Sequence, residues 1–123
     1  MKKPQKQPLK VNNYVLIPEF RFHKKRLWRF DYAILPESEK IAIEIEGGVW
    51  SNGAHVRGKH YISDMEKYNA ANVLGWNILR YTPDQFKTYS FINDLNDLIS
   101  NRYGIIPENL NSYLNLLYNG EMP

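Results

Sequence analysis

Residues 28–35 read Trp-Arg-Phe-Asp-Tyr-Ala-Ile-Leu and residues 40–46 read Lys-Ile-Ala-Ile-Glu-Ile-Glu, with a Pro-Glu-Ser-Glu turn between them. In the second stretch isoleucines alternate with small or acidic residues, and a period of two is typical of a β-strand. Side chains along a strand point alternately to its two faces, so Glu44 and Glu46 share one face while the isoleucines pack inward. The two stretches therefore predict a pair of neighbouring strands around which the chain folds.

Three acidic residues in this strand pair are the candidate chemistry. Glu44 and Glu46 lie about 7 Å apart on one strand face, and two like charges on a mostly apolar strand are costly unless something compensates them. Asp31 adds a third carboxylate from the neighbouring strand. A divalent metal ion is the simplest compensation, and it points to hydrolysis of a charged substrate. Solvated acids on a surface strand are the plainer alternative.

The composition limits the classes of protein to consider. A chain of 123 residues suits one domain with one core. The absence of cysteine excludes disulfides, thiolate nucleophiles and cysteine zinc sites, and it favours a reducing cytoplasm. No apolar run approaches the roughly 18 residues of a membrane span, so no membrane partner is expected. The basic N-terminus has no apolar stretch after it and is not a secretory signal.

Basic residues are concentrated just before Asp31. The net charge of +3 permits a polyanionic partner without requiring one. Residues 21–29 hold five cations and His23 but no acid. One interpretation is a solubilising hairpin tip, and the other is a loop that contacts phosphates beside the carboxylates. The cations are Arg21, Lys24, Lys25, Arg26 and Arg29.

The N-terminal third is expected to hold a tail and two strands ahead of residue 40. Residues 1–10 predict a flexible basic tail, and one short strand is expected near Glu19–Phe22. In the strand over 28–35, alternation predicts one face of Trp28, Phe30, Tyr32 and Ile34 and another of Arg29, Asp31 and Ala33.

The remaining residues alternate between helical and strand patterns. A loop is expected over 49–60, a helix over 61–74 and a strand over 76–81. The sequence Thr-Pro-Asp-Gln that follows the strand is a capping box, which opens a helix reaching about Arg102, and Pro107 can start a last helix. The order β-β-β-α-β-α-α predicts a single α/β domain, a small mixed sheet flanked by helices. We expect its core over 11–104 and a helical extension of the same domain over 105–123.

The motifs, taken in order, resemble the PD-(D/E)xK nuclease superfamily. They are Trp-Arg-Phe-Asp-Tyr-Ala, then Ile-Ala-Ile-Glu-Ile-Glu-Gly-Gly, His55 with Arg57, Asp-Met-Glu-Lys-Tyr-Asn from residue 64, and Gly-Trp-Asn-Ile-Leu-Arg-Tyr-Thr from residue 75. More narrowly, the chain is similar to small phage and bacterial endonucleases related to the very-short-patch-repair type. The resemblance covers residues 19–85. It implies a restriction-endonuclease-like fold and DNA hydrolysis with Mg²⁺ or Mn²⁺ in the cytoplasm of a prokaryotic or phage-infected cell.

The resemblance also implies roles for individual residues. Asp31, Glu44 and the carbonyl of Ile45 would be metal ligands. Glu46 occupies the position usually held by lysine, as in the minority of restriction enzymes with a Glu-x-Glu motif. It could bind metal or act as a base, but it cannot offset negative charge. Lys67 or His55 could supply the missing positive or proton-transferring group, and Arg57 would join the five hairpin cations in contacting DNA.

Several further polar residues have an ordinary structural interpretation beside a functional one. Asp64 stands three residues before Lys67, where the alternatives are a surface ion pair or support for a metal site. A salt bridge is favoured over a phosphate contact for Arg80. Trp50 is the tryptophan best placed to touch nucleic acid. Glu19, as a match to an acid ahead of the motif, and His60 are weaker candidates.

Three functions compete at this point. The first is a metal-dependent DNA endonuclease, and the second is an inactive nucleic-acid-binding module on the same fold, which the missing motif lysine keeps open. The third is an unrelated small α/β interaction protein whose acids are structural. Cleavage of both strands by so small a domain usually requires a dimer, and the helix over 107–118 could form one.

Overall fold

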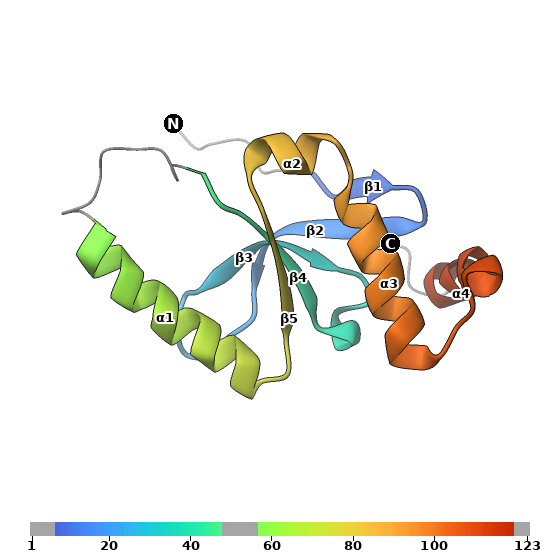
Figure 1. Cartoon of the computed structure of the whole chain (residues 1–123). Coiled ribbons are helices and arrows are strands. Elements are labelled where there is room, and N and C mark those ends of the chain that lie inside the picture. The colour runs from blue at the N-terminus through green and yellow to red at the C-terminus, as the bar shows by residue number, and fades with distance from the viewer. Residues whose placement is uncertain (1–6, 48–56, 120–123) are drawn as a thin grey trace.

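The computed structural model describes residues 7–47 and 57–119, and its centre is a five-stranded sheet in the order β1-β2-β3-β4-β5 (Figure 1). The first three pairings are antiparallel, and β4 pairs with β5 in parallel. The strands are β1 Leu9–Val11, β2 Tyr14–Arg21, β3 Arg29–Ile34, β4 Ile41–Ile45 and β5 Asn77–Tyr81. β5 is therefore one edge of the sheet, and β1 is the other.

The helices confirm the prediction of a mixed α/β domain. They are the long helix α1 Arg57–Val73, the short α2 Pro83–Lys87, α3 Phe91–Tyr103 and α4 Pro107–Asn119, with a 3-10 turn η1 at Glu37–Glu39. A parallel neighbour cannot be reached by a tight turn, so the chain crosses from β4 to β5 through α1. Gly75, which follows α1, has φ 89°, a conformation that favours glycine.

The two faces of the sheet carry different helices. One face packs against α1, where Ala71 joins Phe30, Ala42 and Trp76 in a small buried cluster. The opposite face packs against α3 and α4 and forms the larger cluster (Figure 1). That cluster contains Ile41, Ile43, Phe91, Leu95, Ile99, Leu110 and Leu114 among others. The inward-packing isoleucines of β4 thus face α3 and α4, while Ala42 and Glu44 belong to the α1 side.

The N-terminal region is more ordered than the sequence predicted. Leu9 and Lys10 lie in β1 rather than in a tail, and β2 spans eight residues rather than a short strand near Glu19–Phe22. Pro18 lies within β2, and its missing N–H hid the strand from pattern reasoning because proline disfavours strand interiors.

Alternation fails once in the predicted strand pair. Phe30 packs in the α1-side cluster, whereas Tyr32 and Ile34 pack on the opposite side, so the predicted single face of aromatic residues is wrong. The interruption coincides with Glu19, which has φ 54° between the paired positions Pro18↔Tyr32 and Phe20↔Phe30. A residue with positive φ breaks the regular pleat of a strand.

The helical region also differs from the prediction in its boundaries. α1 begins at Arg57 rather than 61, and the single helix expected from the capping box to Arg102 is two helices. The box itself is present: Thr82 Oγ1 accepts from Gln85 N at 3.2 Å, and Gln85 Oε1 accepts from Thr82 N at 2.9 Å. The break comes at Tyr89, whose φ of 60° cannot continue an α-helix. Within the described residues, no helix has the length and apolar character needed to cross a membrane.

Tyr14 ties β2 to α3 and yields a prediction about alkaline stability. Its side chain is buried, and its hydroxyl donates to Asn96 Oδ1 at 2.7 Å. Burial raises the pKa of Tyr14 far above its ordinary value. Because the folded-state pKa is the higher one, the stability from this group is complete below an ordinary tyrosine pKa of about 10 and is lost as the pH rises through the folded value.

Tyr14→Phe is therefore expected to have two effects. At neutral pH it should lower the free energy of unfolding by about 1 kcal/mol, because it removes a buried hydrogen bond and leaves Asn96 without that donor. Between about pH 9 and about pH 11 the variant should lose stability less steeply than wild type. Urea denaturation at several pH values measures both effects, and parallel curves for the two proteins would contradict the second.

Candidate functional site

β3 and β4 separate at the point where the acidic residues stand. Their pairing consists of Tyr32↔Ile43 and Ala33↔Ala42 and then stops. Beyond these two pairs, toward Asp31 and Ile45, backbone N–H groups donate to side-chain carboxylates of the neighbouring strand instead of to its backbone carbonyls. The N–H of Asp31 donates to Glu44 Oε2 at 3.0 Å, and the N–H of Ile45 donates to Asp31 Oδ2 at 2.7 Å. The predicted neighbourhood of Asp31 and Glu44 is thus present, with each side chain bonded to the other strand.

Two side chains of helix α1 donate hydrogen bonds to the Glu44 carboxylate. Lys67 Nζ donates to Glu44 Oε1 in an ion pair, and the hydroxyl of Tyr68 donates to the same oxygen at 3.3 Å. Both members of the ion pair are largely buried, with side-chain exposures of 14% for Lys67 and 7% for Glu44. Burial raises the pKa of Glu44, and the hydrogen bond and charge of Lys67 oppose that rise. The lysine therefore stabilises a carboxylate that would be costly to bury alone.

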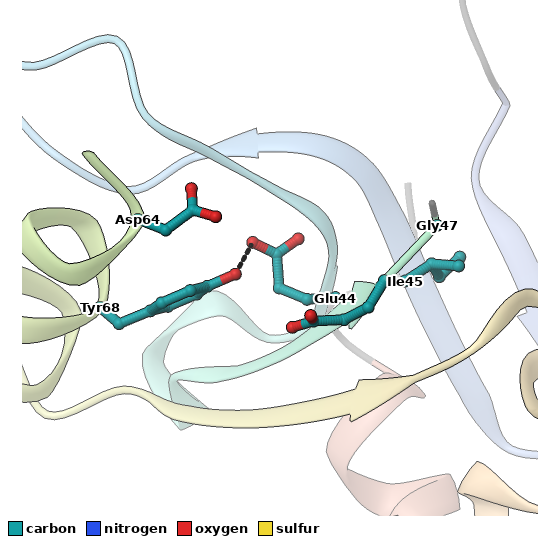
Figure 2. A pocket seen from close by; sticks show the side chains of 6 residues that line it. Glu44, Ile45, Gly47, Asp64 and Tyr68 are labelled. Carbon is teal, nitrogen blue, oxygen red and sulfur yellow. Dashed lines mark hydrogen bonds between the residues drawn. The ribbon is translucent and has the colours of Figure 1, made fainter. Parts of the chain in front are cut away.

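An open hollow of about 230 Å³ lies beside this ion pair. Figure 2 shows Asp64 and Tyr68 projecting from α1 toward Glu44 on β4, with Ile45 and Gly47 continuing the wall. Glu46 also lines the hollow, so Glu44 and Glu46 reach one space as strand alternation predicts. The lining is polar and acidic, which suits a cation rather than an apolar ligand.

Glu46 has a basic partner from β5. Its Oε1 lies 3.3 Å from Arg80 Nε, and Glu44 and Arg80 are register partners in the parallel strand pair. The guanidinium carbon of Arg80 lies 3.8 Å from the centroid of the Tyr68 ring. The salt bridge favoured for Arg80 is confirmed.

The donor atoms suit a hard divalent cation, although the acids do not form the three-residue cluster that the sequence suggested. Within residues 7–47 and 57–119, no three His, Cys, Asp or Glu side chains are grouped as metal ligands. What the site offers is the carboxylates of Asp31 and Glu44 and the nearby carbonyl of Ile45, which accepts from Gly47 N at 3.2 Å. These are oxygen donors of the kind that Mg²⁺ and Mn²⁺ prefer. The role of Glu46 as a ligand stays a prediction.

The basic residues lie on the hairpin between β2 and β3. Arg21, Lys24, Lys25, Arg26 and Arg29 are all exposed. The turn is ordered by its own polar groups. His23 Nδ1 accepts from the backbone N–H of Lys25 and of Arg26, and Arg21 donates to the carbonyls of Lys24 and Arg26.

An ion pair connects this hairpin to α1, the helix that carries Lys67. The guanidinium carbon of Arg26 lies 4.0 Å from the centroid of the Trp28 ring, and its Nη1 is 3.4 Å from Oε2 of Glu66 on α1. Glu66 immediately precedes Lys67, so consecutive residues of α1 contact the basic hairpin and the carboxylate pair. The cluster is therefore an exposed cationic surface, which both interpretations of it require, and it contacts the helix that carries Lys67, which suits the phosphate-contacting interpretation.

Some predicted residues cannot be placed. His55 and Trp50 lie outside the described residues, and of Arg57 and His60 only the helical backbone is described. Glu19 is exposed on β2. Asp64, which had two interpretations, lines the hollow.

Tyr68 is the site residue that sequence reasoning missed. It contacts Glu44 and the Arg80 guanidinium and lines the hollow. The nearby Glu44 charge, after burial itself, raises the pKa of its hydroxyl. The available signal was spacing: Tyr68 follows Asp64 by four residues, so both belong to one face of a helix.

Comparison with known proteins does not identify a relative. No family model, no curated protein and no solved structure matches the chain.

Proposed function

We propose that this chain is a metal-dependent DNA endonuclease of the PD-(D/E)xK type. One observation carries the proposal: carboxylates from two adjacent strands, Asp31 and Glu44, bond across a gap in the sheet, and Lys67 pairs with the second of them. Two acids and a lysine beside a polar hollow form the set of groups that hydrolysis of a phosphodiester uses: oxygen ligands for a cation and a positive charge beside the reacting phosphate.

Each group has a separate role in this proposal. Asp31, Glu44 and the Ile45 carbonyl hold Mg²⁺ or Mn²⁺, which when bound supplies water activation and charge neutralisation. Lys67 supplies the positive charge that Glu46 cannot supply; it orients the Glu44 carboxylate and opposes the rise in the pKa of Glu44 that burial causes. Tyr68 fixes the same carboxylate from α1. The hairpin cations hold the DNA backbone without reading its sequence.

Plasmid nicking tests the proposal. Wild type should relax supercoiled DNA in Mg²⁺ or Mn²⁺, and Asp31→Asn should lower the rate by about a hundredfold or more, the scale of losing a group that stabilises the transition state. Asp97→Asn is the matched control, because Asp97 is an exposed acid on α3, which packs on the other face of the sheet. Equal rates for the two variants would refute the assignment of the site.

A non-catalytic nucleic-acid-binding module is the second candidate. The ion pair between Glu44 and Lys67 favours it, because a carboxylate already neutralised by lysine has less need of a cation. Such a module would bind DNA equally in EDTA and in Mn²⁺ and would leave plasmids intact. An endonuclease would bind Mn²⁺, and Glu44→Gln would weaken that binding.

A further inference from the structure

We propose that Arg80 is a phosphate-binding residue at the edge of the hollow and that Glu46 positions it. The inference rests on the proposed function for its ligand, a nucleic-acid phosphate. It assigns to Glu46 a task other than binding metal, and it turns the salt bridge at Arg80 into part of the substrate site.

The guanidinium of Arg80 is held from two directions by residues that line the hollow. Glu46 contacts its Nε at 3.3 Å, and the Tyr68 ring lies against it at 3.8 Å from the centroid. One contact fixes an edge of the planar group, and the other fixes its face. A cation restrained in this way loses little side-chain freedom on binding, so a larger share of the contact energy goes into affinity.

Part of the Arg80 side chain is exposed to solvent and can contact a ligand. Its side chain is 48% exposed, although two residues contact it. The contact with Glu46 uses Nε, which leaves the two terminal nitrogens as donors. Guanidinium nitrogens form a rigid fork that matches the spacing of phosphate oxygens. The exposed part of this side chain can therefore bind an anion that arrives from solvent, such as a phosphate.

The charge of the hollow explains why such a residue is needed. Glu44, Glu46 and Asp64 line it, and a phosphate approaching these acids is repelled. Lys67 is nearly buried and already paired with Glu44, with 14% of its side chain exposed. Among the side chains that the structure describes, Lys67 and Arg80 contact residues that line the hollow, and Arg80 is the more accessible of the two. It is thus the better placed to attract a phosphate from solvent.

DNA binding without cleavage tests both residues. A fluorescein-labelled duplex is titrated with protein in EDTA at several KCl concentrations, and anisotropy gives the dissociation constant and its salt dependence. The variants are Arg80→Ala, Arg80→Lys, Glu46→Ala and Glu46→Gln. Lys10→Ala is the matched control, because Lys10 is an exposed cation on β1, at the opposite edge of the sheet. Circular dichroism confirms that each variant is folded.

Arg80→Ala should weaken binding about tenfold and reduce the salt slope by about one, the loss of one phosphate contact. Arg80→Lys should recover the slope but not the full affinity, since lysine lacks the fork. Glu46→Ala is the sharper test. Removing an acid should tighten binding on charge alone, whereas loss of a positioning contact should weaken it. Glu46→Gln keeps an oxygen acceptor for Arg80 and should bind at least as tightly as wild type.

Different results would overturn the inference. Arg80→Ala matching Lys10→Ala, or Glu46→Ala binding more tightly than wild type, would remove the phosphate subsite while leaving the endonuclease proposal intact. A calorimetric Mn²⁺ titration separates the two roles of Glu46: unchanged Mn²⁺ affinity in Glu46→Ala agrees with positioning, and a large loss indicates a metal ligand instead. Wild type that binds no DNA would overturn both this inference and the proposed function.

Discussion

Lys67→Met is expected to lower the free energy of unfolding by about 3–5 kcal/mol at neutral pH, the usual cost of leaving one charge of a buried pair uncompensated. The lysine and Glu44 are both largely buried, and among the described residues Glu44 also accepts from the Asp31 N–H and the Tyr68 hydroxyl. Methionine preserves much of the length of the side chain, so the effect reports charge rather than a cavity.

The pH dependence of this variant identifies the cause. Burial already raises the pKa of Glu44, and loss of Lys67 removes the largest opposing influence. A carboxyl group whose folded-state pKa exceeds its unfolded value contributes its full stability below the unfolded pKa, about 4.3 for glutamate, and loses it as pH rises through the folded value. The destabilisation by Lys67→Met should therefore shrink as the pH is lowered from neutral toward that range.

Urea denaturation at pH values from neutral to acid provides the measurement, and two controls sharpen it. The double variant Glu44→Gln/Lys67→Met should be more stable than Lys67→Met alone, because it removes the unpaired charge. Lys87→Met removes an exposed lysine on α2 and should change stability by no more than about 0.5 kcal/mol. If Lys67→Met proved as mild as Lys87→Met, the ion pair would have no structural importance.

Phe91→Ala should destabilise by about 3–5 kcal/mol for a different reason, the cavity left in a packed core. Phe91 has no exposed surface, and its ring stacks on Phe86 with centroids 4.8 Å apart and contacts Tyr81 at 6.1 Å. These rings join α2, α3 and the end of β5, so their loss should loosen the whole layer of helices on that face of the sheet.

Two comparisons make the Phe91 result specific. Phe91→Leu keeps most of the volume and should cost less than about 1.5 kcal/mol. Leu116→Ala truncates a side chain that is 76% exposed on α4 and should be nearly neutral. Because Phe91 packs on the face opposite α1, the DNA affinity that the proposed function requires should be the same in Phe91→Ala and wild type, at a temperature where the variant is folded. An altered affinity would show that the two faces are coupled.

The strand pair and the α/β class could be predicted because alternation and turn residues are local signals. Glu44 and Glu46 line the same hollow, as alternation along the strand predicted. Lys67 lies on the helix that was predicted to follow this strand. The errors arose where a single residue departed from the local rule. Pro18 masked β2, Glu19 with positive φ shifted Phe30 to the other face, and Tyr89 split a helix that looked continuous.

The partners of the acids could not be predicted, because they depend on register and on packing between distant segments. Arg80 reaches Glu46 only because β5 lies parallel to β4 with Glu44 opposite Arg80. Lys67 was one of two candidates for the missing positive group, and only the placement of α1 over the sheet brings it to Glu44. The sequence predicted a cluster of three acids, but it did not show that Lys67 would pair with Glu44 and Arg80 with Glu46.

Under the proposed function, the gap between β3 and β4 has a practical consequence for trapping an inactive complex with DNA. In this gap, the side chains of Asp31 and Glu44 replace backbone carbonyls as hydrogen-bond acceptors. Each carboxylate accepts a bond from a backbone N–H of the opposite strand. Shortening either side chain to alanine would leave a partly buried amide without its acceptor and would weaken the connection between the two strands. Amide replacements retain an oxygen in the same place, so asparagine and glutamine, rather than alanine, are the substitutions suited to crystallising such a complex.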